Sequence, residues 1–260
     1  MSDFKKYLNV YEFNATLPGS GKTVTYKPIT TGQMKNLLMY EEDDDPMVIE
    51  EILDDLISSS VITEDFDVKD LYLQDRFFLL IEIRKQSKGR HFSFKINCPV
   101  CNSQFLQNVD LDKLPFTPKE SEINPFVEVN ENITVALDFI KRQDQQLAAN
   151  IVNQNQKEMT HMQKLADMSL IATALTIQVF ITPEGEDEEV SIEDKVYFLE
   201  NLQQKEFEKI TGWYGDNNFG IDFVAEMKCP HIVPPKRKGG PGKSCEFTEQ
   251  MTIPLENFFF

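Results

Sequence analysis

Long apolar runs are scarce in this chain of 260 residues. The longest stretch without a charged residue, Met168 to Pro183, has 16 residues and contains serine, threonine, glutamine and proline. A membrane-spanning helix needs about 20 consecutive apolar residues. The opening sequence MSDFKKYLNVYEF has no apolar segment of the kind that a secretory signal requires. We therefore expect no membrane partner and a location in a cytoplasm, where cysteines remain thiols or bind metals.

Basic residues are few as well. The chain has 26 lysines and arginines against 43 aspartates and glutamates, which gives a formal net charge of −17. Broad nucleic-acid binding and docking on an anionic membrane both need cations on the protein. We therefore expect no direct nucleic-acid partner.

Histidine occurs only at His91, His161 and His231. None of the three stands in the pattern of a catalytic nucleophile or a metalloprotease. Acidic clusters such as EEDDD at 41–45 indicate solvated surface rather than a catalytic pair of carboxylates. We predict a protein that is not an enzyme and has no small-molecule substrate. An enzyme whose site the sequence does not reveal is the alternative.

The segment PGSGKT, Pro18 to Thr23, ends like a phosphate-binding P-loop. That pattern needs glycine where this chain has Thr16, and it needs a helix after the lysine. Here TVTYKPI follows, which favours a strand. We predict a hairpin turn between FNATL and TVTYKPI, and no nucleotide binding.

Hydrophobic periodicity alternates between the helical and the strand period along the chain, so the predicted fold class is α+β. We expect a helical body that carries antiparallel hairpins, with strands around 92–96, 105–111 and 133–139 and helices around 47–57, 70–87, 142–176 and 191–202. Three regions are predicted to form one compact body: an N-terminal hairpin with helices at 1–90, a mainly helical middle at 117–220, and a β unit made of 91–116 plus 221–260.

The four cysteines, Cys98, Cys101, Cys229 and Cys245, fall in two segments that resemble each other. In each segment an alternating apolar strand precedes a cysteine that is followed by proline. The apolar residues that follow the second cysteine of each pair fall at the same offsets of eight, ten, thirteen and fifteen: Val109, Leu111, Leu114 and Phe116 after Cys101, and Ile253, Leu255, Phe258 and Phe260 after Cys245. We interpret the segments as two copies of one hairpin unit.

Two such hairpins would bring four thiolates to one ion, and zinc takes four cysteine ligands tetrahedrally in structural sites. The sequence therefore predicts a zinc-ribbon-like unit with Cys98, Cys101, Cys229 and Cys245 as ligands, although His231 could replace one sulfur. A redox-active CPVC and four unrelated buried thiols are the alternatives. Redox motifs of this kind open a helix, whereas CPVC lies between two expected strands.

Fifteen residues separate Cys229 from Cys245, so a long loop interrupts the second cysteine pair. The loop carries four cations, Lys236, Arg237, Lys238 and Lys243, among proline and glycine. Such a composition indicates a solvated loop or a contact with an acidic partner. The second functional hypothesis is a zinc ribbon that binds nucleic acid through this loop.

The closing ENFFF is expected to pack into the core of the protein itself, with insertion into a partner as the alternative.

Four segments of the sequence resemble those of a known family: YKPITTGQMKNLL, LYLQDRFFLLIEIRKQSKG, INCPVCNSQF and the closing C…PLENFFF. Together they resemble the baseplate hub family of T-even-type tailed bacteriophages, which contains hub subunits and hub assembly proteins. The middle, about 117–220, contributes no motif to the resemblance.

The resemblance implies a non-enzymatic structural or assembly role in a contractile phage tail. Its partners would be other baseplate hub or tail proteins. The protein would act in the host cytoplasm during assembly, and it would then either remain in the tail baseplate of the virion or leave after assembly.

Overall fold

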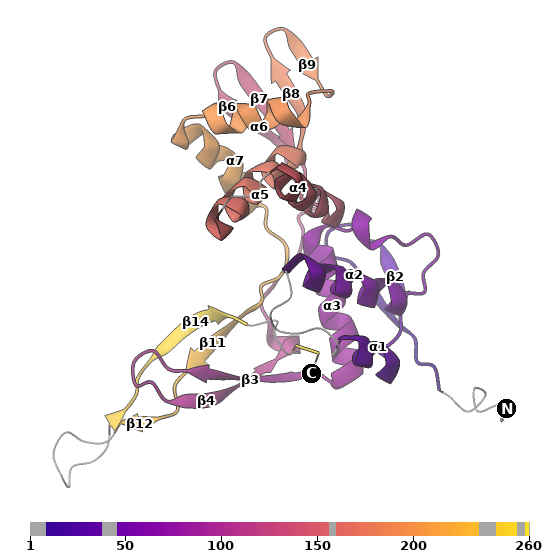
Figure 1. Ribbon diagram of the computed structural model, residues 1–260, viewed down its shortest axis with the longest axis vertical. Helices are drawn as coiled ribbons and strands as arrows, with labels where there is room; N and C mark the ends of the chain where they lie inside the picture. Colours follow the sequence, from indigo (N-terminus) through magenta and orange to yellow (C-terminus); the bar gives the residue numbers. More distant parts are fainter. Residues whose placement is uncertain (1–8, 38–45, 156–159, 234–242, 254–257, 260) are drawn as a thin grey trace.

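The computed structural model describes residues 9–37, 46–155, 160–233, 243–253 and 258–259. Helices and small antiparallel sheets alternate along it, which confirms the α+β class. In Figure 1 a sheet with its helices forms the upper part, a helical group lies at the lower right, and two β-ribbons extend to the lower left. None of the helices in these ranges has the length and apolar character needed to cross a membrane.

The N-terminal hairpin confirms the prediction for PGSGKT. Strands β1 (Phe13–Thr16) and β2 (Thr23–Tyr26) pair antiparallel around it. The backbone N–H groups of Gly19 and Ser20, which a P-loop would direct at phosphate, donate instead to the buried carboxylate of Asp75 at 2.5 and 2.9 Å. A Cβ on Gly19 would lie 2.6 Å from the Phe219 ring and 2.8 Å from Tyr72, so the turn requires glycine there.

The helical group at the lower right consists of α1 (Thr31–Leu37), α2 (Pro46–Ser60), the 3-10 turn η2 (Val68–Asp70) and α3 (Leu73–Lys88). Helix α3, expected around 70–87, is buried on more than one face and ends at Gly89, whose φ of +88° suits glycine. The acidic stretch at 41–45 lies outside the described residues.

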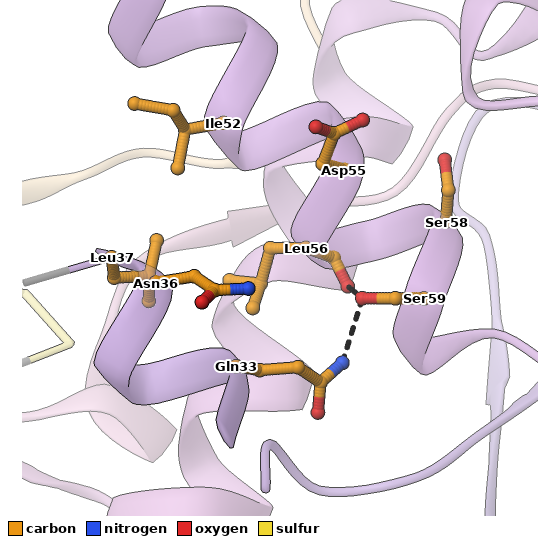
Figure 2. Close-up of a pocket in the computed structure, with 8 residues that line it drawn as sticks. All are labelled: Gln33, Asn36, Leu37, Ile52, Asp55, Leu56, Ser58 and Ser59. Atoms are coloured by element: carbon orange, nitrogen blue, oxygen red, sulfur yellow. Dashed lines mark hydrogen bonds between the residues drawn. The ribbon is translucent and has the colours of Figure 1, made fainter. Parts of the chain in front are cut away.

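Helices α1 and α2 border a hollow of about 790 Å³ (Figure 2). Among the described residues that line it, Asp55 is the one carboxylate, and none is histidine or cysteine. Gln33 Nε2 donates to Ser59 Oγ across the hollow at 2.6 Å.

The upper part contains a four-stranded antiparallel sheet of order β6-β7-β8-β9, formed by β6 (Phe126–Asn130), β7 (Ile133–Leu137), β8 (Ile177–Thr182) and β9 (Gly185–Asp187). Only β7 was expected from the sequence. Proline and asparagine around 117–132 obscured β6. Strand β9 is an exposed Gly-Glu-Asp segment whose extended conformation comes from pairing with β8 rather than from its composition.

Four helices accompany this sheet: α4 (Arg142–Asn155), α5 (His161–Thr176), α6 (Ile192–Asn201) and α7 (Gln204–Asp216). The expected long helix at 142–176 is therefore two helices. Thr160 begins α5 with a reciprocal capping box to Gln163. Helix α6, expected around 191–202, begins after Ser191, whose side chain caps it by accepting from the Asp194 N–H.

The ribbons at the lower left are built from β3 (His91–Asn97) with β4 (Gln104–Asp110), and β11 (Val224–Lys228) with β14 (Thr248–Thr252). Between β11 and β14 the short strands β12 (Ile232–Val233) and β13 (Lys243–Ser244) pair with each other. The 3-10 turn η3 (Leu111–Lys113) follows β4, and β5 (Phe116–Thr117) pairs with β10 (Gly220–Ile221). Each cysteine segment is thus a hairpin, and the second one carries an inserted β-extension.

The end of the chain packs against its own core, as expected. Phe258 and Phe259 are buried, and the Phe258 ring centre lies 5.3 Å from that of Phe92 and 5.4 Å from that of Phe223. Arg84 Nε donates to the Phe258 carbonyl at 3.0 Å. Phe260 lies outside the described residues.

Candidate metal centre

The first cysteine pair lies on the turn between β3 and β4. The Cys98 N–H donates to the Ser103 carbonyl at 2.9 Å, and the Asn102 N–H donates back to the Cys98 carbonyl at 2.8 Å. Asn102 takes a positive φ of 55°, which asparagine tolerates better than most residues. This tight turn brings the side chains of Cys98 and Cys101 close together, as the CPVC spacing predicted.

The second pair is held by an extension of the β11–β14 ladder. The Cys229 N–H donates to the Phe247 carbonyl at 3.1 Å, and the Cys245 N–H donates to the His231 carbonyl at 2.8 Å. These bonds place the two cysteines side by side despite the fifteen residues between them. The interruption therefore leaves the local geometry of the pair intact.

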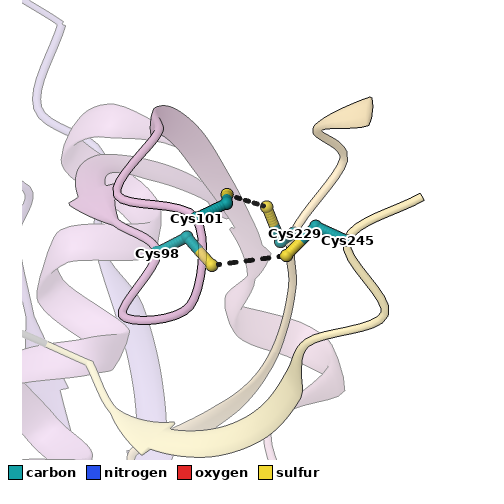
Figure 3. A group of neighbouring side chains, drawn as sticks. All are labelled: Cys98, Cys101, Cys229 and Cys245. Carbon is teal, nitrogen blue, oxygen red and sulfur yellow. Dashed lines mark hydrogen bonds between the residues drawn. The ribbon is translucent and has the colours of Figure 1, made fainter. Parts of the chain in front are cut away.

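The four sulfur atoms meet in one cluster, in which all Sγ atoms lie within 4.8 Å of one another. Figure 3 shows the pair from the first hairpin facing the pair from the second. Cys98 Sγ lies 3.7 Å from Cys245 Sγ, and Cys101 Sγ lies 3.6 Å from Cys229 Sγ. A disulfide needs about 2.05 Å, so neither pair is bonded. Ligands about 2.3 Å from a tetrahedral ion are about 3.8 Å apart, which fits these separations.

The sulfur cluster is largely buried. Cys98, Cys229 and Cys245 are buried, and Phe105 and Phe247 pack against them. Burial raises the pKa of Cys229 to about 12, whereas hydrogen bonds from the Ser103 hydroxyl and N–H lower the pKa of Cys101 to about 6. Several thiolates this close repel one another, so a divalent cation would stabilise their ionised forms.

His231 is exposed, and its backbone carbonyl accepts a hydrogen bond from the Cys245 N–H. The cysteine cluster is the one group of three or more cysteine, histidine and carboxylate side chains with metal-binding spacing in the described parts of the chain. That group consists of the four cysteines and does not include His231. Lys236, Arg237 and Lys238 of the basic loop lie outside the described residues, and Lys243 lies in β13.

Two sets of long-range contacts were not expected from the sequence. Lys119 donates to the Gly19 carbonyl at 3.2 Å, and its ammonium lies 4.8 Å from the centre of the Tyr72 ring. Asp54 pairs with both Arg76 and the fully buried Arg142. In each case the partners lie far apart in the sequence, and no local pattern connects them.

A comparison with protein families matches residues 9–232 to the family described as T4 bacteriophage base plate protein. The match covers most of the chain, includes Cys98, Cys101 and Cys229, and ends before Cys245. No curated protein and no solved structure matches this chain. The family supports a structural role in the phage tail baseplate, with other tail or baseplate proteins as partners. The chain belongs to the T4 bacteriophage base plate protein family.

Proposed function

We propose that this protein is a structural or assembly component of the baseplate hub and acts through contacts with other hub or tail proteins. The family match over residues 9–232 carries the proposal. The hub itself is suggested by the resemblance of the stretches near both ends of the chain, from YKPITTGQMKNLL to PLENFFF. On this proposal the protein acts in the host cytoplasm while the tail is assembled and is found in the virion baseplate.

We also propose that Cys98, Cys101, Cys229 and Cys245 bind one structural zinc ion. Their separations and burial support it, because a closed tetrahedral site of four thiolates leaves no position open for a substrate. The ion would therefore hold the chain in place rather than take part in a reaction. Residues 91–116 and 221–260 would then act as one zinc-ribbon-like unit.

The consequence for binding concerns rigidity. A β-ribbon of two strands is marginally stable by itself, and zinc would join two such ribbons from distant parts of the chain. A surface that is already rigid loses less conformational entropy when a partner binds. The acidic strand β9 and its flanking residues at 184–189 would attract basic partners and favour one orientation of docking.

The alternative is a nucleic-acid-binding zinc ribbon that uses the loop with Lys236, Arg237 and Lys238. The net charge of −17 opposes it, since four cations in one loop do not reverse the field of the whole chain at long range. Binding of DNA or RNA at moderate salt would favour this alternative.

The proposed function is tested with a phage that carries an amber codon early in this gene. Infection of a non-suppressing host is expected to give filled heads without complete tails, seen by electron microscopy, and a plasmid copy of the gene should restore the tails. Normal tails, with a defect only in DNA replication or transcription, would overturn the proposal in favour of the nucleic-acid reading.

A further inference from the structure

We propose that a groove between α4, α5 and α6 is a docking site for a basic amphipathic helix of another protein. The inference rests on the proposed scaffold role, and it adds a surface and a class of partner. The groove is a hollow of about 320 Å³, separate from the cysteine cluster. Its lining consists of Ile151, Asp167, Leu170, Ile171, Ile192, Glu193, Val196, Tyr197 and Glu200.

The floor of the groove is apolar and well supported. Ile171 is buried together with Ala148 and Val152, and Ile151, Ile192 and Val196 pack against this cluster. The floor is therefore part of a packed core and does not need to rearrange to receive a ligand. A preformed apolar surface of this kind suits the apolar face of a helix.

One wall of the groove presents an aromatic anchor. Tyr197 on α6 is 67% exposed although it lines the groove. On α4, Leu147 lies one helical turn before Ile151 and is 45% exposed, so it extends the apolar floor along the same face. Exposed tyrosine and leucine beside an apolar hollow are the residues that a docking helix would bury.

The charge of the groove selects the partner. Among the described residues that line the groove, Asp167, Glu193 and Glu200 are the charged ones, and none of the described lining residues is basic. Lys195, the lysine of α6, donates from Nζ to the carbonyl of Ile177 in β8 at 2.7 Å, so its side chain contacts the sheet. A helix with lysine or arginine beside its apolar residues would place cations next to these carboxylates, whereas an acidic helix would be repelled.

The same charges argue against a second copy of this chain. A two-fold symmetric dimer through the groove would bring two identical sets of carboxylates together. The net charge of −17 on each copy would add to the repulsion. The occupant is therefore a helix of a different protein.

The experiment uses the full chain and two labelled synthetic peptides with the same leucine pattern, one with lysines and one with glutamates. We expect the lysine peptide to bind saturably with one peptide per chain, measured by fluorescence anisotropy, and the glutamate peptide not to bind. Tyr197→Ala should weaken binding at least about fivefold, the usual effect of removing an aromatic anchor. Tyr11→Ala, which removes a tyrosine that is 62% exposed elsewhere, should leave the affinity unchanged.

Charge is tested with two matched double variants. Glu193→Lys with Glu200→Lys should abolish binding, whereas Glu120→Lys with Glu122→Lys, which changes the net charge equally at two exposed positions outside the groove lining, should weaken it little. Circular dichroism confirms the fold of each variant.

Equal loss in both double variants would show attraction by net charge alone and overturn the inference. Binding that is unchanged in Tyr197→Ala would also overturn the inference. Self-association of the chain, if Tyr197→Ala abolishes it, would overturn it as well. The peptide can fail to bind the groove even if the amber phage lacks tails as expected. The two experiments therefore test the groove and the proposed function separately.

Discussion

Cys98 Sγ and Cys245 Sγ lie 3.7 Å apart although 147 positions separate them in the chain. This pair links the β3–β4 hairpin to the one built on β11 and β14. Cys101 and Cys229 make a second link of the same kind at 3.6 Å. The two hairpins are thus joined at their tips by a cluster of side chains that a single ion could hold.

We expect the purified protein to contain about one zinc per chain without added metal, measured by elemental analysis. Cys98→Ser should lose the metal and lower the melting temperature by about 5–10 °C, because structural zinc binding contributes folding free energy. Val100→Ser, in the same turn at a side chain that is 68% exposed, is the control and should keep the zinc. Less than about a tenth of an equivalent of zinc, with four freely reactive thiols in a folded protein, would contradict the assignment.

Lys22→Ala should leave function intact, and ATP should not bind in isothermal titration calorimetry. The reason is that the turn amides of Gly19 and Ser20 are already occupied by Asp75. Asp75→Asn should destabilise the protein by about 1–3 kcal/mol in urea unfolding, because an amide group would replace one acceptor oxygen with a donor. Saturable nucleotide binding that Lys22→Ala removes would show that the hairpin interpretation is wrong.

Asp54→Ala should lower the free energy of unfolding by about 3 kcal/mol. Asp54 Oδ2 lies 2.7 Å from Nε of Arg142, whose side chain is 0% exposed, so the variant would leave a buried charge without its carboxylate. Asp55→Ala removes the neighbouring exposed carboxylate and should change stability by less than about 0.5 kcal/mol. Equal effects of the two variants would mean that the buried pair has no special role.

Phe258→Ala should cost about 3–5 kcal/mol of stability, as expected for a large aromatic side chain removed from a core. Its ring contacts Phe92 and Phe223, and its carbonyl accepts from Arg84. Phe126→Ala, at a ring that is 52% exposed, is the matched control and should cost much less. If Phe258→Ala unfolds like the wild type but fails to support tail assembly, the ending contacts a partner instead.

Local signals in the sequence were sufficient for several elements. The hairpin turn at 18–21 and the helices around 47–57, 70–87 and 191–202 each depend on neighbouring residues, and the structure contains all of them. Strand β6 was missed because proline and asparagine around 117–132 obscured it. Strand β8 pairs with β7 across the intervening helices α4 and α5, and β9 is extended only through its pairing with β8.

The cysteine cluster was predictable because the chain has only four cysteines and they lie in two similar segments. The sequence did not decide between His231 and a fourth sulfur as metal ligand, because the positions of these groups depend on how the inserted loop leaves and rejoins the β11–β14 ladder. The groove of α4, α5 and α6 was also invisible, because each helix supplies only part of its lining.

The central claim, a role in hub assembly through protein contacts, is tested most directly by sedimentation of hub proteins from infected cells. A phage that encodes a tagged copy of this chain is compared with the amber phage. We predict that the tagged chain co-sediments with hub proteins in one complex, and that this complex is missing from the amber infection. A tagged chain that sediments alone, with the hub complex forming equally in its absence, would contradict the account.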